Sequence, residues 1–114
     1  MQKVNRYEKI VYVSHAFGGD ENNLKEIEKI IRACRKQYPN YLFLSPCHAF
    51  GFLYKDTDYI EGLEMCLYML EYKCDEMWYT PSNSSKGVRA EITACCQFNI
   101  PYYNINDKIN IEED

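Results

Sequence analysis

The sequence lacks the features that mark membrane proteins and general nucleic-acid binders. No apolar run approaches the roughly 20 residues of a membrane-spanning helix, and no signal-peptide pattern opens the chain. Lys and Arg number 13 against 17 Asp and Glu, giving a net charge of −4 without any basic run. Because non-specific nucleic-acid binding depends on a basic surface, we expect neither a nucleic-acid polymer nor a membrane as partner. A cytoplasmic location is the default expectation.

Several cofactor motifs are also missing. The chain contains no G-x-G-x-x-G, no Walker lysine and no Cys-x-x-Cys pair, and neither His15 nor His48 has metal-ligand spacing to a cysteine. We therefore expect no metal and no bound cofactor. Several cysteines fall on apolar helix faces, which favours reduced, mostly buried thiols over disulfides. The six are Cys34, Cys47, Cys66, Cys74, Cys95 and Cys96.

What the chain does contain is an alternation of strand and helix patterns. Its 114 residues with 46% hydrophobic content suit one domain over residues 1–114, with a core from about 8 to 105. β-Branched and aromatic runs predict strands at 10–13, 41–44, 77–79 and 100–103. This order predicts an α/β fold, a Rossmann-like three-layer sandwich with a mostly parallel sheet of four to five strands and helices on both faces.

Three segments between these strands have helical periodicity. The first follows Asp20 as its cap and ends near Pro39, and the second runs from 57 or 58 to about 73. The third begins near Gly87 after a Ser84 or Ser85 cap and ends near Asn99, a plausible left-handed C-cap. Its expected apolar stripe is Val88, Ile92, Cys95 and Cys96.

Residues 75–91 are the stretch with the clearest functional pattern. They combine a short aromatic strand, a loop of Pro, Ser and Asn that includes Pro81, and a helix start. A helix N-terminus offers free N–H groups to an anion or a sugar edge, and Glu91 lies one turn beyond Gly87. The structural alternative is that Glu91 only complements the helix dipole.

Two further loops follow strands at the edge where ligands bind in parallel sheets. Residues 14–19 contain Gly18 and Gly19, whose flexibility allows a tight turn, while 45–58 contain His48. His48 is either a ligand-facing group or an ordinary loop histidine. We expect the loops 14–19, 45–58 and 80–87 to meet.

Two segments carry a family resemblance. Tyr12-Val13-Ser14-His15-Ala16-Phe17-Gly18-Gly19 and Ser85-Lys86-Gly87-Val88-Arg89-Ala90-Glu91 resemble the nucleoside 2-deoxyribosyltransferase-like proteins, in particular their small uncharacterised bacterial and phage members. The order of elements matches over nearly the whole chain. The Ser-x-Gly-x-x-x-Glu spacing is moderately specific, and the glycine loop is weakly so.

The resemblance implies roles for individual residues. Glu91 matches the glutamate that attacks the anomeric carbon of a nucleoside in the family's enzymes, chemistry that suits a carboxylate. Ser85 and Gly87 would hold a phosphate or sugar hydroxyl. The family's enzymes carry a second acid, for which Asp58 and Glu61 are the candidates in this chain. The alternative is that Gly62 occupies the position of that acid. The opposite wall would comprise Ser14, His15, Gly18 and Gly19.

Two functions remain open on these grounds. In the first, the protein binds a nucleotide-derived molecule of ADP-ribose or cyclic-nucleotide type and sequesters or senses it, as a phage counter-defence sponge would. Arg89 would bind its phosphate or pair with Glu91, and the base would lie among Phe17, Phe50, Tyr54 and Tyr59. In the second, Glu91 with Asp58 cleaves or transfers N-glycosidic bonds.

The predicted second helix also bears on assembly. Its apolar set is broad enough to be covered on more than one side, and the chain holds 11 tyrosines, a residue frequent at interfaces. The family that the chain resembles is commonly oligomeric. We expect a homo-oligomer, a dimer or higher.

Overall fold

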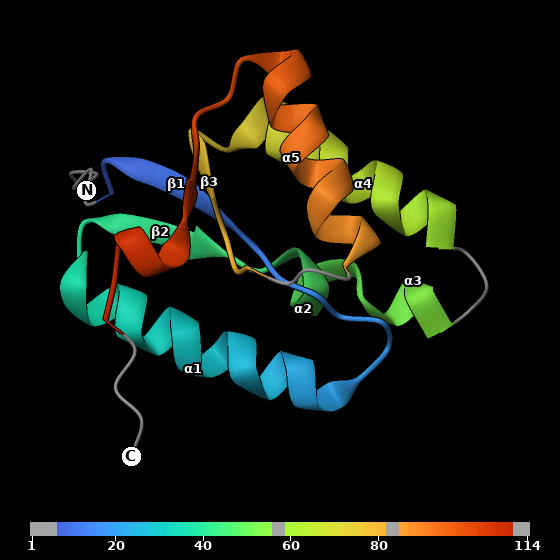
Figure 1. The fold of residues 1–114 in the computed structure, drawn as a ribbon, viewed down its shortest axis with the longest axis horizontal. Coiled ribbons are helices and arrows are strands. Elements are labelled where there is room, and N and C mark those ends of the chain that lie inside the picture. Colours follow the sequence, from blue (N-terminus) through green and yellow to red (C-terminus); the bar gives the residue numbers. More distant parts are fainter. Residues whose placement is uncertain (1–6, 56–58, 82–84, 111–114) are drawn as a thin grey trace, which may run out of the picture.

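The sheet has four strands, and all of them are parallel (Figure 1). A computed structural model describes residues 7–55, 59–81 and 85–110 of the chain. The strands lie in the order β2-β1-β3-β4, which confirms the predicted α/β class. Their bounds are Lys9–Ser14 for β1, Tyr41–Leu44 for β2, Glu76–Tyr79 for β3 and Tyr102–Asn104 for β4.

Helices cover both faces of this sheet, as the alternation of patterns predicted (Figure 1). One long helix, α1, lies on one face, and α4 and α5 lie on the other, so the molecule has three layers. Their bounds are Glu21–Gln37 for α1, Tyr59–Lys73 for α4 and Lys86–Phe98 for α5. Among the described residues, no helix combines the length and apolarity that crossing a bilayer requires.

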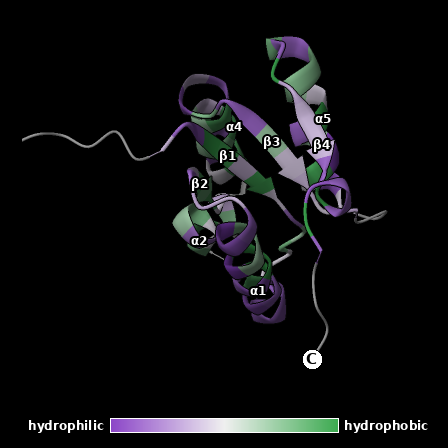
Figure 2. Cartoon of the chain, turned by 90° about the vertical axis from the view of Figure 1, so that its left-hand side faces the viewer, coloured by the Kyte–Doolittle hydropathy of each residue, from purple (hydrophilic) through white to green (hydrophobic). Residues whose placement is uncertain are grey.

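Strand β1 lies at the centre and contributes to both cores, because successive side chains of a strand point to opposite faces. Val11 and Val13 pack under α1 with Trp78, while Tyr12 packs on the other side with Met77 beneath α4 and α5. Figure 2 shows β1 as a hydrophobic strand between the layers, with a hydrophilic outer side on α1. This alternation decides which side chains of β1 reach the site.

The local signals at the helix ends are confirmed. The Asp20 side chain accepts a hydrogen bond from the Asn22 N–H, and Ser85 does the same for Val88. Asn99 takes the left-handed conformation with a φ of 57°, while Gly18 and Gly19 have φ values of 59° and 77°. The two glycines thus make the tight turn that follows β1.

One detail of the prediction was wrong in the segment after β2. Residues 45–58 were expected as loop, but α2 (Pro46–Phe50) and α3 (Phe52–Lys55) form there. Helix α2 begins because Ser45 is its N-cap and Pro46 suits the first helical position. After β4, a 3₁₀ turn, η1 (Ile105–Asp107), leads to Ile109, which is buried under the α1 face.

The inward stripe of α5 also differs from the expected one. The helix buries Val88, Glu91, Ala94 and Cys95, whereas Cys96 is exposed. Because 3.6 residues make a turn, a stripe that starts at Val88 passes through position 91. A glutamate therefore lies on the face that packs against the sheet. All six cysteines are unpaired.

Candidate functional site

A cavity of about 800 Å³ opens at the carboxyl ends of the strands. It lies where the strand order reverses, since the chain passes from β1 outward to β2 and then returns to β3. The loop after β1, helix α2 and the start of α5 all contribute to its wall, so the three predicted loop regions do meet. Helix α4 closes one side with Gly62, Leu63 and Cys66. A volume of this size is typical of small-molecule sites.

Glu91 of α5 forms part of the cavity wall, although only 6% of the residue is exposed. Each of its carboxylate oxygens accepts a hydrogen bond from a hydroxyl of β1. The Ser14 Oγ donates to one oxygen over 2.9 Å, and the Tyr12 hydroxyl donates to the other. Neither Tyr12 nor Ser14 lines the cavity, so both orient the carboxylate from the sheet side.

The environment of Glu91 changes its acidity. Burial raises the pKa of its carboxyl from 4.5 to about 7, and the hydrogen bonds from Tyr12 and Ser14 partly oppose this rise. In the described part of the chain, no cation pairs with this carboxylate. Near neutral pH, Glu91 can therefore act as a hydrogen-bond acceptor, a base or a nucleophile when ionised, and as a donor when protonated.

Two thiols lie in the wall near this carboxylate. Burial, together with a smaller effect of the negative charge of Glu91, raises the pKa of Cys47 to about 12 and that of Cys66 to about 11. The thiols stay protonated at neutral pH, so they are weak donors and not nucleophiles. Cys66 also interacts with the Tyr12 hydroxyl, whose own pKa burial raises well above 10.

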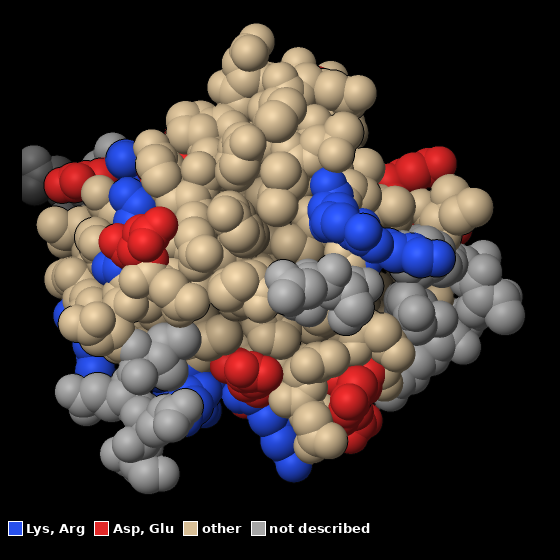
Figure 3. All heavy atoms as spheres, viewed as in Figure 1, with Lys and Arg blue, Asp and Glu red and all other residues tan. Residues whose placement is uncertain are grey.

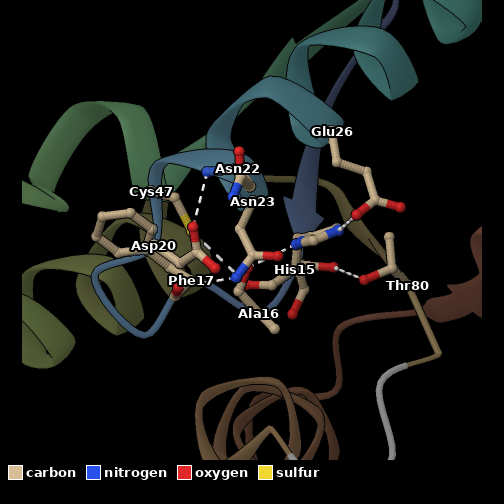
Figure 4. A network of polar contacts seen from close by, with 10 residues as sticks. His15, Ala16, Phe17, Asp20, Asn22, Asn23, Glu26, Cys47 and Thr80 are labelled. Carbon is tan, nitrogen blue, oxygen red and sulfur yellow. Dashed lines mark hydrogen bonds and ion pairs between the residues drawn. The ribbon is translucent and has the colours of Figure 1, made fainter.

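The turn after β1 is held by its own polar network, which Figure 4 shows. The Asn23 side chain donates to the Phe17 carbonyl over 2.9 Å, and His15 Nδ1 lies 2.6 Å from the Ala16 carbonyl. On its other side, His15 Nε2 lies 3.6 Å from a carboxylate oxygen of Glu26. The network fixes His15, Phe17 and Asn23, and all three line the cavity.

Gly51 permits the close packing of Phe17 at the cavity wall. A Cβ atom at position 51 would lie 2.8 Å from the Phe17 ring and 2.2 Å from the Cys47 carbonyl oxygen. Any larger residue would therefore push the ring or the end of α2 away. Phe17 and Phe50 give the cavity its aromatic surface.

The structure brings together half of the predicted site residues in this cavity. In addition to Glu91, those that line it are His15, Phe17, Gly18, Phe50, Ser85 and Gly87. Ser14 reaches the site through its bond to Glu91. Gly19 shapes the turn next to Gly18 but does not line the cavity.

Three more of the predicted ligand residues lie outside the cavity wall and make no contact with Glu91. His48 faces α1, where its Nδ1 lies 2.6 Å from Ser45 Oγ and its Nε2 lies 3.0 Å from a carboxylate oxygen of Glu28. Arg89 and Pro81 are exposed to solvent outside the cavity wall. The predicted pairing of Arg89 with Glu91 does not form, because Glu91 accepts hydrogen bonds from the hydroxyls of Tyr12 and Ser14. Asp58 and the side chain of Tyr59 lie outside the described residues.

The sequence analysis missed several residues of the site, above all Tyr12, Cys47, Cys66, Asn23 and Lys86. One signal could have identified Tyr12: positions 12 and 14 of a strand share a face, so both must point to the same helix layer. Among the described residues, no cluster of three or more His, Cys, Asp or Glu side chains could hold a metal ion.

One family model matches most of the chain. A family model described as "Domain of unknown function (DUF7768)" matches residues 9–105, from β1 to the end of β4. The match includes Tyr12, Ser14 and Glu91 and every described residue that lines the cavity. No curated protein matches the sequence.

Proposed function

Because the chain belongs to the DUF7768 family, whose description names no function, we propose a function from the site itself: the protein binds a nucleotide-derived small molecule in the cavity and sequesters or senses it. The observation that carries this proposal is Glu91. It is a buried carboxylate without a cation among the described residues, and it borders a cavity of about 800 Å³. Ligand hydroxyls are suitable partners for such a group.

The chemistry of the wall fits the parts of a nucleotide. Ionised Glu91 would accept hydrogen bonds from ribose hydroxyls, and Phe17 and Phe50 would pack against the base. Lys86 and the first N–H groups of α5 border the same cavity and would face a phosphate. The choice of a nucleotide among polar ligands rests on the resemblance to nucleoside 2-deoxyribosyltransferase-like proteins.

Cleavage or transfer of an N-glycosidic bond is the second candidate, and the orientation of Glu91 favours it. Two hydroxyls fix the carboxylate at the cavity wall, and its pKa of about 7 leaves a large ionised fraction at neutral pH. Such a carboxylate can attack an anomeric carbon. However, Glu91 is the only acid in the described wall of the cavity, whereas glycosidases generally use two.

Calorimetric titration with a panel of nucleosides, nucleoside monophosphates, ADP-ribose and cyclic nucleotides would test the proposal. We expect at least one phosphate-bearing ligand to bind. Glu91→Gln should weaken its affinity by about 10- to 100-fold, because charge-assisted hydrogen bonds are lost. Absence of binding across the panel at about 1 mM would contradict the proposal.

Chromatography of the same mixtures after incubation separates the two candidates. A ligand that is recovered intact supports sequestration or sensing. A free base that forms with wild type but not with Glu91→Gln supports the enzyme. A base released equally by both proteins would exclude Glu91 as nucleophile.

A further inference from the structure

The outer surface of the α4/α5 layer exposes aromatic side chains in a stripe. Tyr68 and Tyr72 are 62% and 61% exposed, their ring centroids lie 4.6 Å apart, and Met65 is 39% exposed on the same side of α4. Single exposed apolar residues are normal, but a row along one helix face is typical of a protein–protein contact. This surface faces away from the cavity, which α4 lines with Gly62, Leu63 and Cys66.

The same surface carries separated charges. Glu61 and Glu64 are exposed in the first half of α4, and Arg89 is exposed in the first half of α5. Figure 3 shows basic side chains over the start of α5 with acidic ones close by over α4. Within the part of the chain that the structure describes, no ion pair joins these three side chains.

We propose that this surface forms the interface of a homodimer in which α4 of each copy packs along α5 of the other. Helices α4 and α5 run in roughly the same direction, because each links two parallel strands of one sheet. A two-fold axis that runs between them and parallel to them places each α4 over the α5 of the second copy. The first halves of the two helices then lie together.

This arrangement gives partners to the charged side chains and to the two tyrosines of the surface. Glu61 and Glu64 of one copy face Arg89 of the other, and the two-fold axis repeats the contact. The second half of α4, with Tyr68 and Tyr72, lies over the second half of α5. Exposed polar groups there can bond to the tyrosine hydroxyls, namely those of Thr93 and Gln97.

Pairing of α4 with α4 is disfavoured by charge. That contact would bring Glu61, Glu64 and Glu71 of both copies together, with Lys73 as the one basic residue of the helix. Like charges across an interface are destabilising. The basic side chain of Arg89 therefore selects the α4–α5 arrangement, and the interface gives this exposed residue a role that the cavity does not.

The size of the surface sets the expected affinity. Helices of 15 and 13 residues lying side by side present a face about 20 Å long and about 20 Å wide. Such a face buries roughly 500 Å² per copy, or about 1,000 Å² in the pair, which is at the lower limit for a specific interface. We therefore expect a dimer that dissociates in the micromolar range.

Sedimentation equilibrium of the full chain from about 5 to 300 µM tests the proposal. The mass should rise from 13.5 kDa to twice that value across this range. Tyr68→Glu should raise the dissociation constant at least about tenfold. Leu42→Glu, which adds the same charge at an exposed position of β2, should leave it unchanged.

A charge-reversal series tests the arrangement itself. Glu61→Arg and Arg89→Glu should each weaken the dimer, and the double variant should restore it to within a few-fold of wild type. These positions are exposed, so the series remains informative if Tyr68→Glu does not fold, which circular dichroism would reveal. A chain that is monomeric at every concentration, a dimer insensitive to Tyr68→Glu, or a double variant without restoration would each overturn the proposal. The interface does not depend on which ligand the cavity binds.

Discussion

Among the described residues, two glutamates are buried on opposite faces of the sheet, and they differ in their hydrogen-bond partners. Glu76 of β3 is 5% exposed, and its two oxygens accept hydrogen bonds from Lys9 Nζ over 2.8 Å and from Trp78 Nε1 over 2.6 Å. Glu91 of α5 is 6% exposed, yet its partners are the hydroxyls of Tyr12 and Ser14.

The two carboxylates differ in whether the fold compensates their charge, and this difference motivates the proposal that Glu91 meets a ligand. Lys9 compensates the charge of Glu76 within the fold, which limits the cost of its burial. The charge of Glu91 has no such compensation among the described residues, and burial raises its pKa to about 7. Under the proposed function, a group that costs stability and borders a cavity is retained because a ligand would meet it there.

The largest expected effect is the pH dependence of stability that Glu91→Gln removes. Burial raises the pKa of Glu91 from 4.5 to about 7 on folding, so the folded chain binds the proton more tightly. The favourable contribution of the protonated form is complete below pH 4.5 and is lost as pH rises through 7. The penalty at pH 8 and above is about 3 kcal/mol.

Urea unfolding of both proteins between pH 5 and pH 8.5 would measure this effect. Glu91→Gln should become more stable relative to wild type as pH rises. A difference in unfolding free energy that is constant over this range would show that Glu91 has an ordinary pKa.

Tyr12→Phe should have the next largest effect. It removes the hydroxyl that donates to Glu91, so the pKa of Glu91 should rise further and the variant should lose about 1–3 kcal/mol of stability at pH 8. Tyr38→Phe is the matched control, because the Tyr38 hydroxyl donates to the Lys108 carbonyl and to no charged group. Its loss should be about 1 kcal/mol at every pH. If the two variants lose unfolding free energy with the same dependence on pH, the Tyr12 hydroxyl does not set the pKa of Glu91.

Lys9→Met removes the cation that pairs with Glu76. The variant should lose about 1–2 kcal/mol, less than a fully buried pair would, because the Lys9 side chain is 42% exposed to solvent. Ligand affinity should not change. If this variant instead weakens the ligand as much as Glu91→Gln does, the division between the two glutamates fails.

The smallest effects are expected for His48→Ala and Arg89→Ala, which test the boundary of the site. Both side chains are exposed outside the cavity wall, so each variant should keep ligand affinity within about twofold and stability within about 0.5 kcal/mol. Calorimetry with the identified ligand provides the measurement. A tenfold loss of affinity in either variant would return that residue to the site.

Much of the fold could be predicted because its signals are local. Asp20, Ser85 and Asn99 mark helix ends through bonds or backbone conformations within a few residues, and they occupy the expected positions. The helices at 46–55 were missed because Ser45-Pro46 is compatible with both a turn and a helix start.

The site was harder to predict because it depends on the direction of side chains in space. Arg89 lies two positions before Glu91, which is about 200° around a helix, so the two residues face opposite sides. Tyr12 looked like one of several apolar strand residues, and its role follows only once α5 is known to cover its face of β1. Cys66 and Gly62 enter the site through the packing of α4.

The most direct test of the central claim is mass spectrometry of the small molecules released when purified wild type and Glu91→Gln are denatured in parallel. We predict a nucleotide-type molecule from wild type and at least about tenfold less of it from Glu91→Gln. Equal amounts from both proteins would contradict the claim that the buried carboxylate is retained for a ligand.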